Sequence, residues 1–129
     1  MPWSVVYRAN DTDVVKHTFD WVSDGSGAAS VASSVPVSGT ILRVSFIPSA
    51  TAVPTTLYDV VLNDADGFDV LAGQGANLSE TTKTNVCPGV PLKDGATTSV
   101  TPMVVDSILT LVVSNAGASK AGKVIVYVR

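Results

Sequence analysis

The sequence predicts an all-β fold, a single-domain antiparallel β-sandwich or jelly roll of about eight strands. Short runs rich in Val, Ile, Thr and aromatic residues recur between clusters of turn-forming residues, and helical periodicity is almost absent. The chain has 129 residues, which is the size of one ordinary domain. We therefore expect one sandwich over residues 1–129, with residues 1–10 as an N-terminal arm. Because the Cys and Trp spacing of immunoglobulin domains is missing, the sequence leaves jelly-roll and immunoglobulin-like topologies open.

Strands are predicted wherever an apolar run lies between turn residues. They cover residues 3–8, 14–22, 40–47, 57–62, 68–71, 97–105, 107–114 and 123–128, with 81–86 as an edge strand. The small-residue stretches 23–34 and 72–79 are predicted as loops. The last two strands are predicted to pair with each other through the glycine-containing turn 115–122. The expected core consists of Leu42, Val44, Phe46, Leu109, Leu111, Val113, Val124 and Val126.

The composition argues against several kinds of partner. Charged residues make up only 15% of the chain, the net charge is −3, and Lys and Arg form no cluster, so that nucleic acid is excluded as a partner. The apolar runs are too short to span a membrane, and the N-terminus has no secretory signal, so we expect synthesis in a cytoplasm. With 46% apolar residues, the surface is expected to adhere to other proteins.

The residues that carry enzyme chemistry are scarce. The only histidine, His17, shares a predicted strand face with aromatic residues, which favours a packed, hydrogen-bonded side chain over a general base. The only glutamate, Glu80, has no carboxylate partner nearby in the sequence, and Cys87 has no neighbour that would activate it. No nucleotide-binding or nucleophile motif occurs. We predict that the chain is not an enzyme and binds no cofactor.

Three aspartates, Asp64, Asp66 and Asp69, surround Gly67 in one short segment. Carboxylates around a glycine turn are hard oxygen ligands of the kind that calcium prefers, but the glycine and the acidic residue at the end of an EF-hand loop are out of place here. The interpretation we favour is hairpin-turn chemistry without a bound metal, and a calcium site is the alternative.

The terminal strand is apolar on both faces. Val124, Val126 and Val128 alternate with Ile125 and Tyr127, whereas one face of a sandwich strand normally meets water. We therefore predict a protein interface at Ile125 and Tyr127, either in a homo-oligomer or against a larger assembly. In the alternative interpretation, the loop 72–79 or the N-terminal arm of the same chain covers them.

Residues 57–79, which include Asn-Asp-Ala-Asp-Gly-Phe-Asp, and residues 109–128, which end in Val-Ile-Val-Tyr-Val, resemble small structural proteins encoded among the head genes of tailed bacteriophages. The resemblance implies a capsid decoration or cement protein with a β-sandwich or jelly-roll fold. Such a protein is made in the host cytoplasm and is located in the virion, where it binds the major capsid protein or other virion subunits. It implies no particular functional residues. The alternatives are a tail, neck or baseplate subunit and, in another class, a carbohydrate-binding module.

Overall fold

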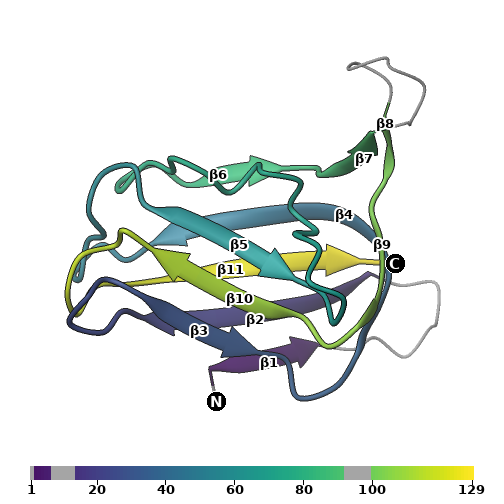
Figure 1. Ribbon diagram of the computed structural model, residues 1–129, viewed down its shortest axis with the longest axis horizontal. Helices are drawn as coiled ribbons and strands as arrows, with labels where there is room; N and C mark the ends of the chain where they lie inside the picture. Colours follow the sequence, from purple (N-terminus) through teal and green to yellow (C-terminus); the bar gives the residue numbers. More distant parts are fainter. Residues whose placement is uncertain (1, 7–13, 92–99) are drawn as a thin grey trace.

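The computed structural model describes residues 2–6, 14–91 and 100–129 (Figure 1). These residues form eleven strands and no helix, which confirms the all-β prediction. The strands are β1 (Trp3–Val6), β2 (Val15–Val22), β3 (Ala29–Ala32), β4 (Val37–Pro48), β5 (Asp59–Asn63), β6 (Thr84–Val86), β7 (Gly89–Pro91), β8 (Val100–Pro102), β9 (Val104–Ser107), β10 (Thr110–Ser114) and β11 (Ala121–Val128). Within this part of the chain, no helix could span a membrane.

Two sheets face each other. The larger has the order β1-β2-β11-β4-β6, with β9 paired to the first residues of β4, and the smaller has the order β3-β10-β5. Every pairing between these strands is antiparallel. Figure 1 shows the smaller sheet lying across the larger one, and the β7–β8 hairpin projecting from one end. The structure is thus an antiparallel β-sandwich with more strands than the sequence predicted.

The core lies between the two sheets. Seven of the eight predicted core residues are buried there: Val44, Phe46, Leu109, Leu111, Val113, Val124 and Val126. The aromatic face of β2 also points inward, because Phe19 and Trp21 are almost fully buried. Alternation along β2, β10 and β11 therefore identified the inward faces correctly.

The core prediction is wrong for Leu42, since 36% of the surface of this residue is exposed. The register between β4 and β11 shifts here: Tyr127 pairs with Arg43, but Val128 pairs with Ile41. Leu42 is the extra residue of this β-bulge, and a bulge reverses which side chains face inward on either side of it. Ile41 and Val44 therefore both point into the core, and Leu42 points outward.

The predicted pairing of the last two strands is also wrong. β10 lies in the smaller sheet between β3 and β5, and β11 lies in the larger sheet between β2 and β4. The turn between them therefore crosses from one sheet to the other. Hydrogen bonds from two distant segments hold it: Thr55 N donates to Ala116 O at 2.8 Å, and Lys120 N donates to Ser23 Oγ at 2.8 Å. In this arrangement, each of the two strands is paired on both of its edges.

Three other predictions need correction. The proposed loop 23–34 contains β3, whose single large apolar residue, Val31, is buried beside β10. The proposed N-terminal arm is instead strand β1 over residues 3–6, paired to β2. Residues 1 and 7–10 of that arm lie outside the described residues. Residues 68–71 form no strand, although Asp69 makes a single bridge to Asn63. The predicted edge strand 81–86 is confirmed in part, because β6 lies at the edge of the larger sheet.

The proposed exposed loop 72–79 packs partly against β5. Val60 N donates to Gly75 O at 2.7 Å, and Leu78 N donates to Tyr58 O at 2.8 Å. Both Gly75 and Leu78 are buried. This segment therefore lies beside β5, and a single bridge, between Tyr58 and Leu78, joins it to the residue before that strand.

Candidate functional site

The two residues predicted as an interface, Ile125 and Tyr127, lie on the outer face of the larger sheet. Ile125 is only 6% exposed, although it does not belong to the core. Its direct neighbours across the sheet are Thr18 and Ser45. Of the two alternative covers, residues 72–79 pack on β5 and residues 3–6 form a strand of the same sheet, while residues 7–10 of the N-terminal arm lie outside the described residues. Ile125 is therefore not an exposed apolar residue of the single chain.

Tyr127 is half-buried and lies in a row of side chains that crosses four strands. The register pairs Val6 with Lys16, Lys16 with Tyr127, and Tyr127 with Arg43. The Arg43 guanidinium carbon lies 4.3 Å from the centroid of the Tyr127 ring, which is a cation–π contact. We call these four residues the Tyr127 row. It combines an aromatic ring, two cations and Val6, which is 45% exposed.

The cations of the Tyr127 row differ from Lys123, the other lysine on β11. Lys123 Nζ lies 3.8 Å from Asp20 Oδ1, and both side chains are about half exposed. By contrast, no salt bridge joins Lys16 or Arg43 to a carboxylate among the described residues. The row therefore presents two positive charges on a chain whose net charge is negative.

Two of the three aspartates considered as metal ligands, Asp64 and Asp69, accept hydrogen bonds from backbone N–H groups. Asp64 Oδ1 accepts hydrogen bonds from the backbone N–H of Asp66 at 3.0 Å and of Phe68 at 2.9 Å. Asp69 accepts three, from Leu62, Leu71 and Gly73. Among the described residues, no group of three or more His, Cys, Asp or Glu side chains is placed to hold a metal ion. This geometry agrees with the turn interpretation of the segment.

An apolar groove lies at one end of the sandwich, where the segment 64–72 meets β7 and β9. Its volume is about 450 Å³. It is lined by Asp64, Phe68, Asp69, Val70, Ala72, Val90, Met103 and Val104, which we call the Phe68 groove. Phe68 is 72% exposed, Val104 is 68% exposed and Val90 is 41% exposed. Large apolar side chains gathered on a surface in this way are typical of a contact site.

Local structure explains why these apolar side chains face solvent. The Asp64 carboxylate and the positive φ of Gly67 close a tight turn that leaves Phe68 outside the sheet. In β9, Val105 points into the core, so that the alternation of the strand turns Val104 and Asp106 outward. A hydrogen bond of 3.2 Å from Ala65 N to Ser107 Oγ joins the turn to the end of β9. The two sides of the groove are therefore connected directly.

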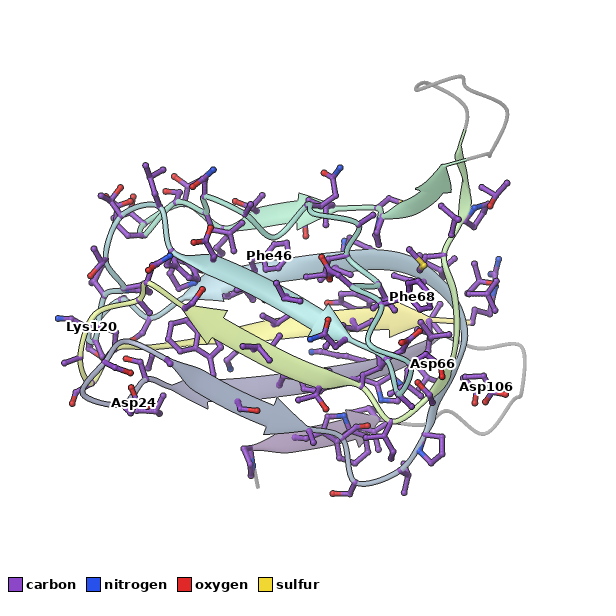
Figure 2. The ribbon with its side chains drawn as sticks, in the orientation of Figure 1. Asp24, Phe46, Asp66, Phe68, Asp106 and Lys120 are labelled. Carbon is purple, nitrogen blue, oxygen red and sulfur yellow. The ribbon has the colours of Figure 1, made fainter. Side chains whose placement is uncertain are left out.

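The surroundings of the Phe68 groove are acidic. Asp64 and Asp69 line it, and Asp66 and Asp106 are exposed at the same end of the molecule, where Figure 2 shows them with Phe68. Ser38 Oγ donates to Asp106 Oδ1 at 2.6 Å and holds this carboxylate on the outer side of β9. None of the described residues that line the groove is Lys or Arg. The groove therefore combines a large apolar surface with negative charge.

The other side chains considered from the sequence do not line the Phe68 groove. His17 is buried and stacks on Trp3, with ring centroids 5.8 Å apart, and burial lowers the pKa of its imidazole. The packing prediction is confirmed, but His17 Nδ1 has no hydrogen-bond partner within the described residues. Cys87 is exposed, as a loop residue would be. Because Trp3 and Trp21 are both buried, neither offers the exposed aromatic platform of a sugar-binding site.

The sequence did not identify the Phe68 groove, because it assigned Phe68 and Val104 to ordinary predicted strands. One signal was available: Phe68 follows Gly67 and has aspartates close on both sides, which is an unusual setting for a core residue. Comparisons of the chain with protein-family models, with curated proteins and with solved structures find no match. Function is therefore inferred from the surfaces themselves.

Proposed function

We propose that the chain is a structural protein of a virus particle, a capsid decoration protein that stabilises the assembled shell by non-covalent contacts. The observation that carries the proposal is the exposed Phe68 groove on an otherwise well-packed sandwich. Phe68 is 72% exposed beside Val104, and apolar side chains gathered in this way are unusual on the surface of a protein that works as a free monomer. Burial of this surface against a neighbouring subunit is the function that the groove supports best.

The resemblance to phage head proteins implies no functional residues, but one of the segments that carry it lines the groove. The segment 57–79, which carries much of that resemblance, supplies Asp64, Phe68, Asp69, Val70 and Ala72 to the groove. Val60 N in β5 donates to Gly75 O, and Leu78 N donates to Tyr58 O just before β5. These hydrogen bonds hold the end of the segment, which favours a groove that is formed before any partner binds. A preformed surface binds at a lower cost in conformational entropy than one that must be ordered first.

We further infer that the sandwich is a jelly roll. From β2 to β6, each strand lies in the opposite sheet from the strand before it, and β10 and β11 continue this alternation. The resulting sheets, β2-β11-β4-β6 and β3-β10-β5, have the strand order of a jelly roll without its eighth strand. Jelly rolls are common in viral shells because they leave few exposed strand edges.

The mechanism of such a protein is adhesion. A chain that binds the assembled shell but not its separate subunits shifts the equilibrium toward the assembled state by mass action. In this mechanism, the partners are the major capsid protein or other virion subunits, and many copies act together. As a tail, neck or baseplate subunit, the chain would bind its neighbours by the same kind of non-covalent contact at a different place in the particle.

The experiment compares particles made with the wild-type chain and with two groove variants, Phe68→Ser and Val104→Ser. We expect both variants to fold and to be lost from purified particles, as measured by quantitative protein composition and electron microscopy. The matched control is Val22→Ser, because Val22 is 70% exposed but lies outside the groove. Full occupancy by both groove variants, or equal loss of the control, would overturn the assignment of the groove.

A further inference from the structure

We propose that the Phe68 groove receives the Tyr127 row of a second copy of this chain. This inference rests on the proposed function and deepens it, because it names the partner of the same groove. It is carried by the complementary chemistry of two surfaces on one molecule. The groove is apolar and acidic, whereas the row is aromatic and basic.

The charges favour contact between the two different surfaces. Asp64, Asp66 and Asp106 place carboxylates in and around the groove, and Lys16 and Arg43 place cations on both sides of Tyr127. Opposite charges brought together at an interface guide the encounter and set its orientation. Among the described residues, no carboxylate forms a salt bridge with Lys16 or Arg43, and Arg43 is exposed.

The same charges oppose contact between two like surfaces. Two grooves placed face to face would bring their carboxylates together, and two Tyr127 rows would bring four cations together. Like charges held close across an interface are strongly unfavourable. The contact therefore joins unlike surfaces, either once per pair in a closed ring or open chain of copies, or twice in a reciprocal two-fold dimer.

The apolar parts of the two surfaces also match. Phe68 projects from the groove with 72% of its surface exposed, and Val6 and the half-buried Tyr127 offer it an apolar and aromatic contact. The exposed ring of Phe68 can also accept a cation–π contact from Lys16 or Arg43 of the neighbouring copy. Aromatic and arginine side chains of this kind dominate the energy of many interfaces.

The test measures the mass of the free chain by light scattering and sedimentation at up to ~1 mM, at low and high salt. The wild type is expected to self-associate, and high salt is expected to weaken the association. Phe68→Ser and Arg43→Glu are each expected to weaken association at least about 30-fold, whereas Val22→Ser leaves it unchanged. A wild type that is monomeric at every concentration would overturn the inference.

Mixing the two variants tests whether the groove of one copy meets the row of another. Phe68→Ser keeps an intact row and Arg43→Glu keeps an intact groove, so the mixture has one functional contact and forms a one-to-one heterodimer. Absence of this heterodimer, with a self-associating wild type, refutes the groove-to-row contact. If Phe68→Ser is lost from particles while the free wild type never associates, the groove binds a different protein. In that case this inference fails and the proposed function stands.

Discussion

Substitution of Gly75 by alanine tests how the groove segment is held against the sandwich. A Cβ atom on Gly75 would lie 2.2 Å from Val60 O and 3.0 Å from Leu71 Cδ1. Relief of that overlap requires the segment to move away from β5 by roughly 1 Å, since unbonded carbon and oxygen atoms cannot approach so closely. A shift of this size lengthens the 2.7 Å hydrogen bond from Val60 N to Gly75 O beyond hydrogen-bonding distance.

The expected cost follows from these two effects. Loss of a buried backbone hydrogen bond costs about 1 to 3 kcal/mol, and the disturbed packing around Leu71 adds about 1 kcal/mol or more. We expect Gly75→Ala to lower the free energy of unfolding by about 3 kcal/mol, which corresponds to a fall in Tm of roughly 10 °C. Chemical denaturation and calorimetry measure both quantities. The control is Gly25→Ala, where a Cβ meets nothing within 4 Å. Equal stability of the two variants would show that residues 72–78 are not docked on β5.

Three further predictions concern the bulge, the buried histidine and the aspartate turn. Because the bulge turns Val44 inward and Leu42 outward, Val44→Ala is expected to lower the free energy of unfolding by about 2 kcal/mol and Leu42→Ala by less than about 0.5 kcal/mol. Chemical denaturation of both variants measures the difference. Burial lowers the pKa of His17 below its ordinary 6.5, so stability is complete above that pH and falls as the pH drops toward the folded-state pKa. His17→Phe should flatten the dependence of Tm on pH between about 7 and 5, and an unchanged slope would contradict this. Asp69→Ala should cost about 2 kcal/mol, while a chelator leaves the wild-type Tm unchanged; a fall with chelator would restore the calcium interpretation.

Sequence patterns were reliable where a strand has one buried and one exposed face. Alternation in β2 and β10 identified inward residues such as Phe19 and Leu111 without any knowledge of the partners. The same rule failed at Leu42, because a bulge inserts one residue and no sequence signal marks it. The local pattern predicts that a strand forms, but which of its side chains face inward also depends on how it pairs with the neighbouring strand.

Pairing between strands was harder to predict than the strands themselves. The turn between β10 and β11 has the glycine and asparagine content of a hairpin, yet it crosses between sheets. Hydrogen bonds from Ser23 and Thr55, far away in the sequence, decide that path. A short strand such as β3 likewise depends on the pairing that β10 offers, because it has little apolar surface of its own.

The candidate site was predicted in part. Asp64 and Asp69 accept backbone hydrogen bonds, as the turn interpretation expected, and Tyr127 was selected as a surface residue of interest. The sequence did not reveal that Ile125 is only 6% exposed, or that Lys16 and Arg43 lie on either side of Tyr127. It also missed the Phe68 groove, since β5, β7 and β9 bring its residues together from distant segments. Surfaces assembled across strands require the register, which a single sequence does not contain.

The most direct test of the central claim, that the Phe68 groove is the docking surface of the chain in a virus particle, is an electron cryomicroscopy reconstruction of particles that carry it. We predict many copies on the outside of the shell, each with Phe68 and Val104 covered by a neighbouring protein. A reconstruction in which these side chains face solvent in every copy, with attachment through another surface, would contradict the claim. So would particles that contain no copy of the chain.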